Sequence, residues 1–239
     1  MDITERQRFI LKAIINEYIQ NGKPVGSSVL GKKYDIPASP ATIRYEMARL
    51  AHEGLITKPH RSAGRVPTIT GLKFYLSNIF EEGVVDYRIE TEIKSRLNKA
   101  RFDKEKLLRE CVSILAEKTE TLGWSIMPDG VRVSGISYIL DFPKDLLKVI
   151  FALMEDDKMI REILSNFKGK GLIVILGDEF GLKGLSNCAW LLHRVELYGL
   201  RGILGILGPL SLNYHKAIPI LKFVASTVTN LVKDWKPRK

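Results

Sequence analysis

The sequence predicts an α+β fold that begins with a small helical domain closed by a β-hairpin. Three observations support this prediction. Apolar residues recur at helical spacing through most of the first 55 positions, and turn signals at 21–24 and 35–38 divide them into three helices. In the carboxyl-terminal half, short aliphatic runs typical of strands lie among helical stretches. Helices and strands that occupy separate parts of a chain in this way are typical of the α+β class.

The first two helices are predicted from their start signals. Thr4 and Gln7 have the spacing of a capping box, so the first helix begins there and runs to about Asn21. After a Gly/Pro turn, Ser27 is the expected N-cap of a short helix over 28–34. A third helix follows after another tight turn, which makes the second and third helices a helix-turn-helix. In that arrangement the last helix enters the major groove of DNA.

The third helix has clear ends and two distinct faces. Ser39 is a good N-cap, Pro40 suits the first turn, and Gly54 supplies a left-handed stop. An apolar stripe is formed by Ile43, Met47 and Leu50. The outer face is short, polar and basic, and it consists of Ala41, Thr42, Arg44, Tyr45, Ala48, Arg49 and His52. An ordinary amphipathic surface helix shows the same pattern, so this helix alone leaves both interpretations open.

A β-hairpin is predicted directly after the third helix. Residues 55–58 and 65–68 are typical of short strands, and 59–64 of the loop between them. We interpret the hairpin as the wing of a winged helix, since it follows a helix-turn-helix; a solvated basic turn is the alternative. It carries up to four donors, which are Lys58, His60, Arg61 and Arg65. Thr70 is expected to cap a fourth helix that packs back on the first.

The charge of the chain indicates an anionic partner. The net charge is +10 with a pI near 9.5, which points to nucleic acid or a membrane surface. Residues 1–76 hold 12 Lys+Arg and 6 Asp+Glu, so the excess is concentrated around the predicted reading helix. No apolar run approaches the roughly 18 residues of a spanning helix, and the charged amino end is unlike a secretory signal. We therefore expect a cytoplasmic protein that does not enter a membrane.

Residues 81–87 form the predicted boundary to the carboxyl-terminal half. Helices are expected over 88–100 and from Asp103 to near Gly123, either as a dimer seam or, as we favour, as packing for a sheet. Strands are expected over 132–137, 172–177 and 200–207. Further helices are expected over 142–153, 158–167 and 214–235, the last with a kink at Pro219.

No motif predicts catalysis, a metal or a cofactor. Cys111 and Cys188 have no CxxC partner and no zinc pattern, so two buried thiols in a reducing cytosol are expected. Gly202, Gly205 and Gly208 recur every three residues without forming a phosphate-binding motif. His193 and Glu196 have no nucleophile at useful spacing. The chain is accordingly predicted not to be an enzyme.

The sequence resembles the HrcA family of bacterial heat-inducible transcription repressors. The resemblance lies in TERQRFILKAIINEYIQNGKPVGSSVL, in SPATIRYEMARLAHEGLI and above all in KPHRSAGRVPTITGLKFY. The last run is specific, because an unrelated winged helix does not require this combination of residues. A looser resemblance to the family's GAF-like domain covers 131–235. The resemblance implies a dimeric repressor that binds an inverted-repeat operator, called CIRCE, upstream of chaperone operons. It also implies that the chaperonin GroEL modulates the repressor.

Eleven residues are expected to contact DNA, and the resemblance carries over by position Thr42, Arg44 and Tyr45 of the reading helix and the wing residues from His60 to Arg65. The reading helix is expected to contact base edges through Arg44, Thr42 and Tyr45, with Ala41 and Arg49 on the same face. Phosphates or the adjacent minor groove are expected to be contacted by Ser39, Lys58, Arg61 and Arg65, and the wing also holds His60 and Ser62. Family members usually have Asn at position 45 and commonly Thr at position 61. Tyr cannot pair bidentately with adenine as Asn does, so DNA binding is still expected but the family's exact operator sequence does not carry over to this chain.

The resemblance also predicts a compact form of the family. The chain passes from IMPDG directly into VRVSGISYIL, where the family has further strands and an inserted dimerisation domain. The predicted organisation is a winged helix domain at 1–80, a linker helix at 81–102 and a reduced GAF-like domain at 103–239. A homodimer is still expected, because a helix-turn-helix reads an inverted repeat through two half-sites.

Three other functions are alternatives to this prediction. The GAF-like domain could bind a small metabolite and regulate another operon, which a thermal-shift screen of ligands would detect. A general nucleic-acid-coating module would show no preference among duplexes. A redox or hydrolytic enzyme would depend on Cys188.

Overall fold

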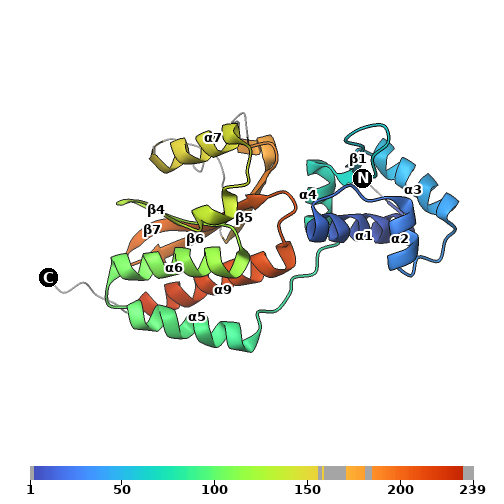
Figure 1. The fold of residues 1–239 in the computed structure, drawn as a ribbon. Coiled ribbons are helices and arrows are strands. Elements are labelled where there is room, and N and C mark those ends of the chain that lie inside the picture. Colours follow the sequence, from blue (N-terminus) through green and yellow to red (C-terminus); the bar gives the residue numbers. More distant parts are fainter. Residues whose placement is uncertain (1–2, 156–157, 159–170, 181–184, 234–239) are drawn as a thin grey trace. The chain divides into compact units, whose positions relative to one another are not determined.

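A computed structural model describes residues 3–155, 158, 171–180 and 185–233 (Figure 1). The chain divides into two compact units, Met1–Glu81 and Glu82–Lys239. The first is mainly helical with a small hairpin, and the second combines helices with an antiparallel sheet. The predicted α+β class is confirmed. None of the helices in the described part of the chain is long and apolar enough to cross a membrane.

The first unit contains the predicted elements in the predicted order. They are α1 (Glu5–Asn21), α2 (Ser27–Lys33), α3 (Pro40–His52), β1 (Ile56–Thr57), β2 (Val66–Pro67) and α4 (Ile69–Asn78). The capping box of Thr4 and Gln7 is present. Two predicted caps are wrong. Gly26 is the N-cap of α2, and the hydroxyl of Thr68, directly after β2, caps α4 by accepting from the Gly71 N–H at 2.9 Å.

Packing on α1 fixes the orientation of α3. α1 contacts α2, α3 and α4, and its buried face meets the apolar stripe of Ile43, Met47 and Leu50. A buried polar contact adds direction to this packing, since the Gln7 side-chain amide donates to the Glu46 carboxylate at 2.8 Å. Burial of one face of α3 leaves the opposite face of the helix on the surface.

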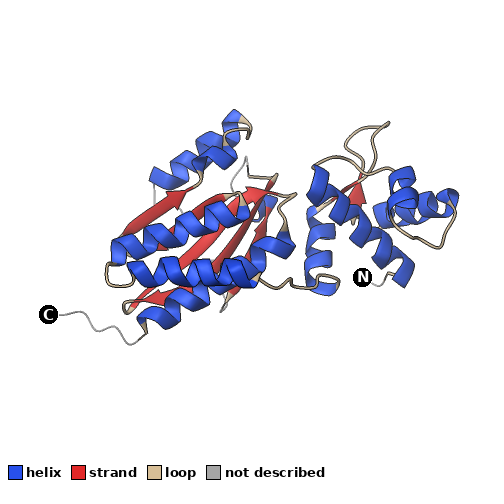
Figure 2. Cartoon of the chain, turned by 60° about the horizontal axis from the view of Figure 1, so that its bottom comes forward, coloured by secondary structure: helices blue, strands red, loops and turns tan. Residues whose placement is uncertain are grey.

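The second unit is a five-stranded antiparallel sheet covered by helices on both faces. Its strands are β3 (Leu122–Met127), β4 (Gly130–Ser134), β5 (Leu172–Leu176), β6 (Cys188–Leu197) and β7 (Leu200–Pro209), in the order β4-β3-β7-β6-β5. Figures 1 and 2 show α6 (Lys104–Thr119) and α9 (Tyr214–Val232) side by side over one face. α7 (Lys144–Glu155) packs on the other, around the edge-to-face pair of Trp124 and Trp190.

Two strands of this sheet, β3 and β6, were not predicted. β4 also begins and ends earlier than the predicted 132–137, and α6 ends at Thr119 rather than near Gly123. Pro219 lies inside α9 as predicted. The short 3-10 turns Ile136–Ile139 and Gly177–Phe180 complete the unit. The helix predicted over 158–167 falls, except for Lys158, outside the described residues.

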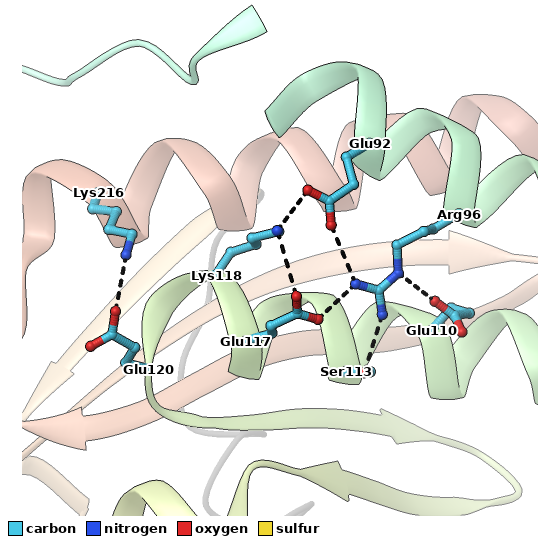
Figure 3. Close-up of polar contacts among 8 residues, drawn as sticks. All are labelled: Glu92, Arg96, Glu110, Ser113, Glu117, Lys118, Glu120 and Lys216. Carbon is cyan, nitrogen blue, oxygen red and sulfur yellow. Dashed lines mark hydrogen bonds and ion pairs between the residues drawn. The ribbon is translucent and has the colours of Figure 1, made fainter. Parts of the chain in front are cut away.

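An ion-pair network fastens α5 (Tyr87–Ala100) to α6 (Figure 3). The Arg96 guanidinium donates to the Glu110 and Glu117 carboxylates at 2.9 and 2.7 Å and to the Ser113 hydroxyl at 3.3 Å. The Lys118 ammonium donates to the Glu92 carboxylate at 2.7 Å. Since α5 also contacts α9, α5 packs within the second unit, and it occupies most of the segment predicted as a linker helix over 81–102.

Candidate nucleic-acid interface

The outer face of α3 is exposed over its whole length. Arg44, Tyr45 and Arg49 are exposed, with Tyr45 at 62%, and Ala41 lies on the surface beside them. The start of the helix is held by Ser39, whose hydroxyl accepts from the Thr42 N–H at 3.1 Å. Helix α3 therefore presents short and cationic side chains to solvent, which is the residue set that base edges and phosphates require.

The hairpin extends its loop from the paired strands β1 and β2 (Figure 1). Lys58, His60, Arg61 and Ser62 are exposed, and Arg65 is half-buried. Two contacts order the loop from within. The Lys58 ammonium donates to the Arg61 carbonyl at 3.3 Å, and the His60 Nδ1 lies 3.1 Å from the Ser62 hydroxyl. The loop thus holds several cations and polar donors over a short span.

The hairpin is also attached to the turn between α1 and α2. Val25 and Arg65 exchange two backbone hydrogen bonds, each 2.8 Å long. Gly64 makes this approach possible, because a Cβ there would lie 2.5 Å from the Val25 carbonyl carbon. The base of the wing is therefore joined directly to the helix-turn-helix.

The cations of this surface are electrostatically uncompensated. Among the described residues, no carboxylate pairs with Arg44, Arg49, Lys58, Arg61 or Arg65, whereas Arg8, Lys12 and Lys33 elsewhere in the first unit do have such partners. Lys33, for example, pairs with Glu17 on the α1–α2 side. Unpaired positive charge concentrated on one surface attracts a polyanion.

All eleven predicted site residues belong to the first unit and lie on α3, on its cap or on the hairpin. Each is exposed or half-exposed, so none is part of the hydrophobic core. The attachment of the wing through Val25 and Gly64 was not predicted. A Gly at position 64 was its only sequence signal, and a Gly in a loop does not identify what lies against it.

The described residues show no arrangement suited to metal chemistry. No group of three His, Cys, Asp or Glu side chains within the described ranges could hold a metal ion. Both cysteines are buried as expected. Burial raises the pKa of the Cys188 thiol to about 12 and also raises the pKa of Cys111. A thiol held protonated in this way is a poor nucleophile.

Comparison with known proteins identifies one family. Residues 74–218 match the model described as the HrcA protein C terminal domain. The heat-inducible transcription repressor HrcA of Moorella thermoacetica is 35% identical, with 98% of this chain and 99% of the relative aligned. The protein of the same name from Fusobacterium nucleatum is 23% identical, with 100% and 96% aligned.

One solved structure has the same fold. It is the crystal structure of a hypothetical protein, with a TM-score of 0.81 at 20% identity and with 96% of this chain and 98% of that chain covered. The alignment with one relative is also longer than this chain. The Moorella thermoacetica alignment runs over 341 residues although this chain has 239, so the relative holds a long stretch without a counterpart here.

Proposed function

This chain belongs to the HrcA family of heat-inducible transcription repressors, and from that premise we propose that it represses chaperone genes by binding operator DNA through α3 and the wing. The observation that supports this proposal most is the set of uncompensated cations shared by these two elements. A family of repressors provides no role for an enzyme active site, and the buried thiols agree with that.

We assign base reading to α3. Arg44, Thr42 and Tyr45 stand near the amino end of its exposed face, the part of a recognition helix that contacts base edges. Arg can pair bidentately with guanine, while Tyr can contact a thymine methyl or a phosphate. Ala41 leaves room for close approach, and Arg49 extends the same face.

We assign backbone contacts to the helix cap and the hairpin. Ser39, Lys58, Arg61 and Arg65 would contact phosphates, or would enter the minor groove beside the groove that α3 reads. His60 and Ser62, at 3.1 Å from each other, stiffen the loop that carries them. These contacts would supply affinity, and α3 would supply sequence preference.

The operator is proposed to be an inverted repeat of the CIRCE type bound by a homodimer. A two-fold protein reads two half-sites about 34 Å apart on one side of the duplex. Because Tyr45 and Arg61 are proposed to contact the DNA and differ from the residues usual in the family, the half-site sequence is expected to differ from that of the family. Modulation by GroEL and a cytoplasmic location belong to the same proposal and depend on family membership.

Selection of bound duplexes from a random pool tests the function directly. An inverted repeat among the recovered duplexes is expected; recovery without any preference would contradict the proposal and favour a coating module. Arg44→Ala should then reduce the preference for the selected duplex by about 1–3 kcal/mol. Lys58→Ala should weaken selected and scrambled duplexes equally and lower the salt slope by about one unit. Equal losses on both duplexes for Arg44→Ala would rule out base reading by that residue.

A further inference from the structure

A hollow of about 340 Å³ lies inside the first unit, where the hairpin meets α2 and α3. We call it the wing notch. Its polar lining comes from three elements: Lys58, Ser62 and Arg65 of the hairpin, Arg44 of α3, and Ser27 and Ser28 at the start of α2. Met47, which is buried, contributes an apolar part of the wall. None of the residues that line the wing notch is acidic.

The backbone holds the two sides of the wing notch at a fixed separation. The hydrogen bonds between Val25 and Arg65 join the hairpin to the residue just before Gly26 and Ser27, which line the opposite wall. Both bonds are 2.8 Å long, and Gly64 allows the two segments to approach each other. Cations of the hairpin and hydroxyls of α2 therefore face one space without either element having to move.

The polar groups of the wing notch are available for an external anion. Arg44, Lys58 and Arg65 have no carboxylate partner in the described ranges of the chain. The hydroxyls of Ser27 and Ser28 likewise have no hydrogen-bond partner among the described residues. Ammonium, guanidinium and hydroxyl groups are the usual side-chain donors to phosphate oxygens in protein–DNA interfaces. The wing notch thus combines charge, donors and an absence of acid.

We propose that the wing notch holds one DNA backbone phosphodiester, with Arg65 and Ser28 as its principal ligands. This inference rests on the proposed function and deepens it. A protein that places a helix in the major groove and a hairpin in the next minor groove must straddle the strand that separates the grooves. The wing notch lies between those two elements, so the phosphate it receives is the one at that border. Neither Ser28 nor Ser27 was among the predicted contacts.

A phosphate held from both sides has a defined consequence for register. Arg65 approaches it from the wing, and Ser28 approaches it from the helix-turn-helix. The position of α3 along the major groove is then fixed relative to one backbone atom, because phosphate contacts orient a protein on the duplex. Arg44 belongs to the wall of the wing notch that α3 forms, and it therefore links the wing notch to the base-reading face of that helix.

Methylphosphonate scanning tests this assignment. Each phosphate of one half-site in the duplex recovered from the random pool is replaced in turn by a neutral methylphosphonate, and the Kd of the full chain is measured by fluorescence anisotropy. We expect one border position per half-site at which neutralisation weakens binding about tenfold. Arg65→Ala and Ser28→Ala should each weaken binding to the unmodified duplex. Both variants should lose the effect at that position while keeping it elsewhere.

The control is Arg109→Ala, which removes an exposed Arg that is paired with Glu105 in the second unit. This variant should keep the full position dependence. If the tenfold effect persists undiminished in both Arg65→Ala and Ser28→Ala, the wing notch does not hold that phosphate, although sequence-specific binding stands. If the unchanged chain shows no preference among duplexes, the proposed function fails, and the assignment of the wing notch fails with it.

Discussion

Some cations of the two units lie in opposite electrostatic settings. On α3 and the hairpin, Arg44, Lys58 and Arg65 have no carboxylate partner in the part of the chain that is described. In the second unit, Arg96 and Arg132 each have carboxylates at 2.7 to 3.7 Å. Paired charges cancel locally and fasten helices to each other or to the sheet. Unpaired charges leave a field that a polyanion can neutralise.

This difference shows that net charge alone is a weak guide to an anion-binding surface. The whole chain has a net charge of +10, yet many of the basic residues in the second unit are engaged within that unit. In the first unit, Arg44, Arg49, Lys58, Arg61 and Arg65 lack carboxylate partners among the described residues and lie on α3 and the hairpin. The comparison therefore predicts that removing cations will affect DNA binding in one unit and stability in the other.

The largest effect is expected from Lys58→Ala combined with Arg65→Ala. Loss of two charged phosphate contacts should weaken DNA binding about a hundredfold. It should also lower the slope of log K against log salt by about two. Titration of a labelled duplex at several salt concentrations measures both quantities. An unchanged salt slope would contradict the comparison, and a circular dichroism melt is the control for folding.

A smaller effect, on stability rather than binding, is expected from Arg96→Ala. It removes contacts to Glu110, Glu117 and Ser113, so the second unit should lose roughly 1–2 kcal/mol of unfolding free energy. Urea denaturation followed by tryptophan fluorescence is selective, since all three Trp residues belong to the second unit by position. Arg96→Lys should recover part of the loss. A loss of DNA affinity at full stability would overturn this division of roles.

A modest acid sensitivity is expected in the second unit. Hydrogen bonds from Arg132 and Arg96 hold the pKa values of Glu105 and Glu117 below their ordinary value of 4.5. Carboxylates whose pKa is lowered in the folded state stabilise the fold at pH values above their ordinary pKa of 4.5. This contribution is lost as the pH falls through the lowered pKa. The urea midpoint by fluorescence should therefore decline below about pH 4.5. Arg96→Ala should make this decline shallower; an unaltered profile would show that Glu117 contributes nothing.

The smallest effect is expected from Lys148→Ala. Its partner Asp145 is 93% exposed and Lys148 is 79% exposed, so the 3.4 Å pair is surrounded by water. Surface pairs of this kind contribute little because solvent screens them and both side chains lose rotamer freedom. No measurable change in the urea midpoint or in DNA affinity is expected. A clear destabilisation would mean that the burial of an ion pair does not predict whether the pair stabilises this fold.

The first unit followed its sequence closely because its signals are local. The capping box at Thr4 and the N-cap at Ser39 each depend on residues within three positions, and both are present. The cap of the fourth helix was misplaced because Thr68 and Thr70 are equally suitable by residue type. The end of β2 at Pro67 decides between them.

The sequences of the two unpredicted strands, β3 and β6, lack the usual strand signals. The first five residues of β6 are all buried, because helices cover both faces of the sheet there, so apolar and polar residues do not alternate as they do in a half-exposed strand. The polar residues His193, Arg194 and Glu196 occur only in its second half. β3 contains Gly123, a residue unfavourable in strands. The small residue is needed because a Cβ at Gly123 would lie 2.3 Å from the Val112 carbonyl oxygen of α6.

The candidate site was predictable residue by residue but not as a shape. Helical spacing identified the outward positions of α3, and their exposure agrees with that prediction. The wing notch depends on Val25 meeting Arg65, which are 40 positions apart and have no complementary side-chain signal. Backbone pairing between distant segments leaves little trace in residue type, so the position of Ser28 in the wall of the wing notch could be found only from the structure.

The joint between Val25 and Arg65 limits how this winged helix can be re-engineered. A wing transplanted from another repressor would bring its own residue to position 64, and any side chain there would collide with the Val25 backbone. Residues 22–28 and 58–67 therefore form one exchangeable module, and chimeras that cut between them should fail to fold around the new hairpin. Designers who want to retarget the protein have more freedom on the outer face of α3, where Tyr45 and Arg49 can be varied without disturbing the interior.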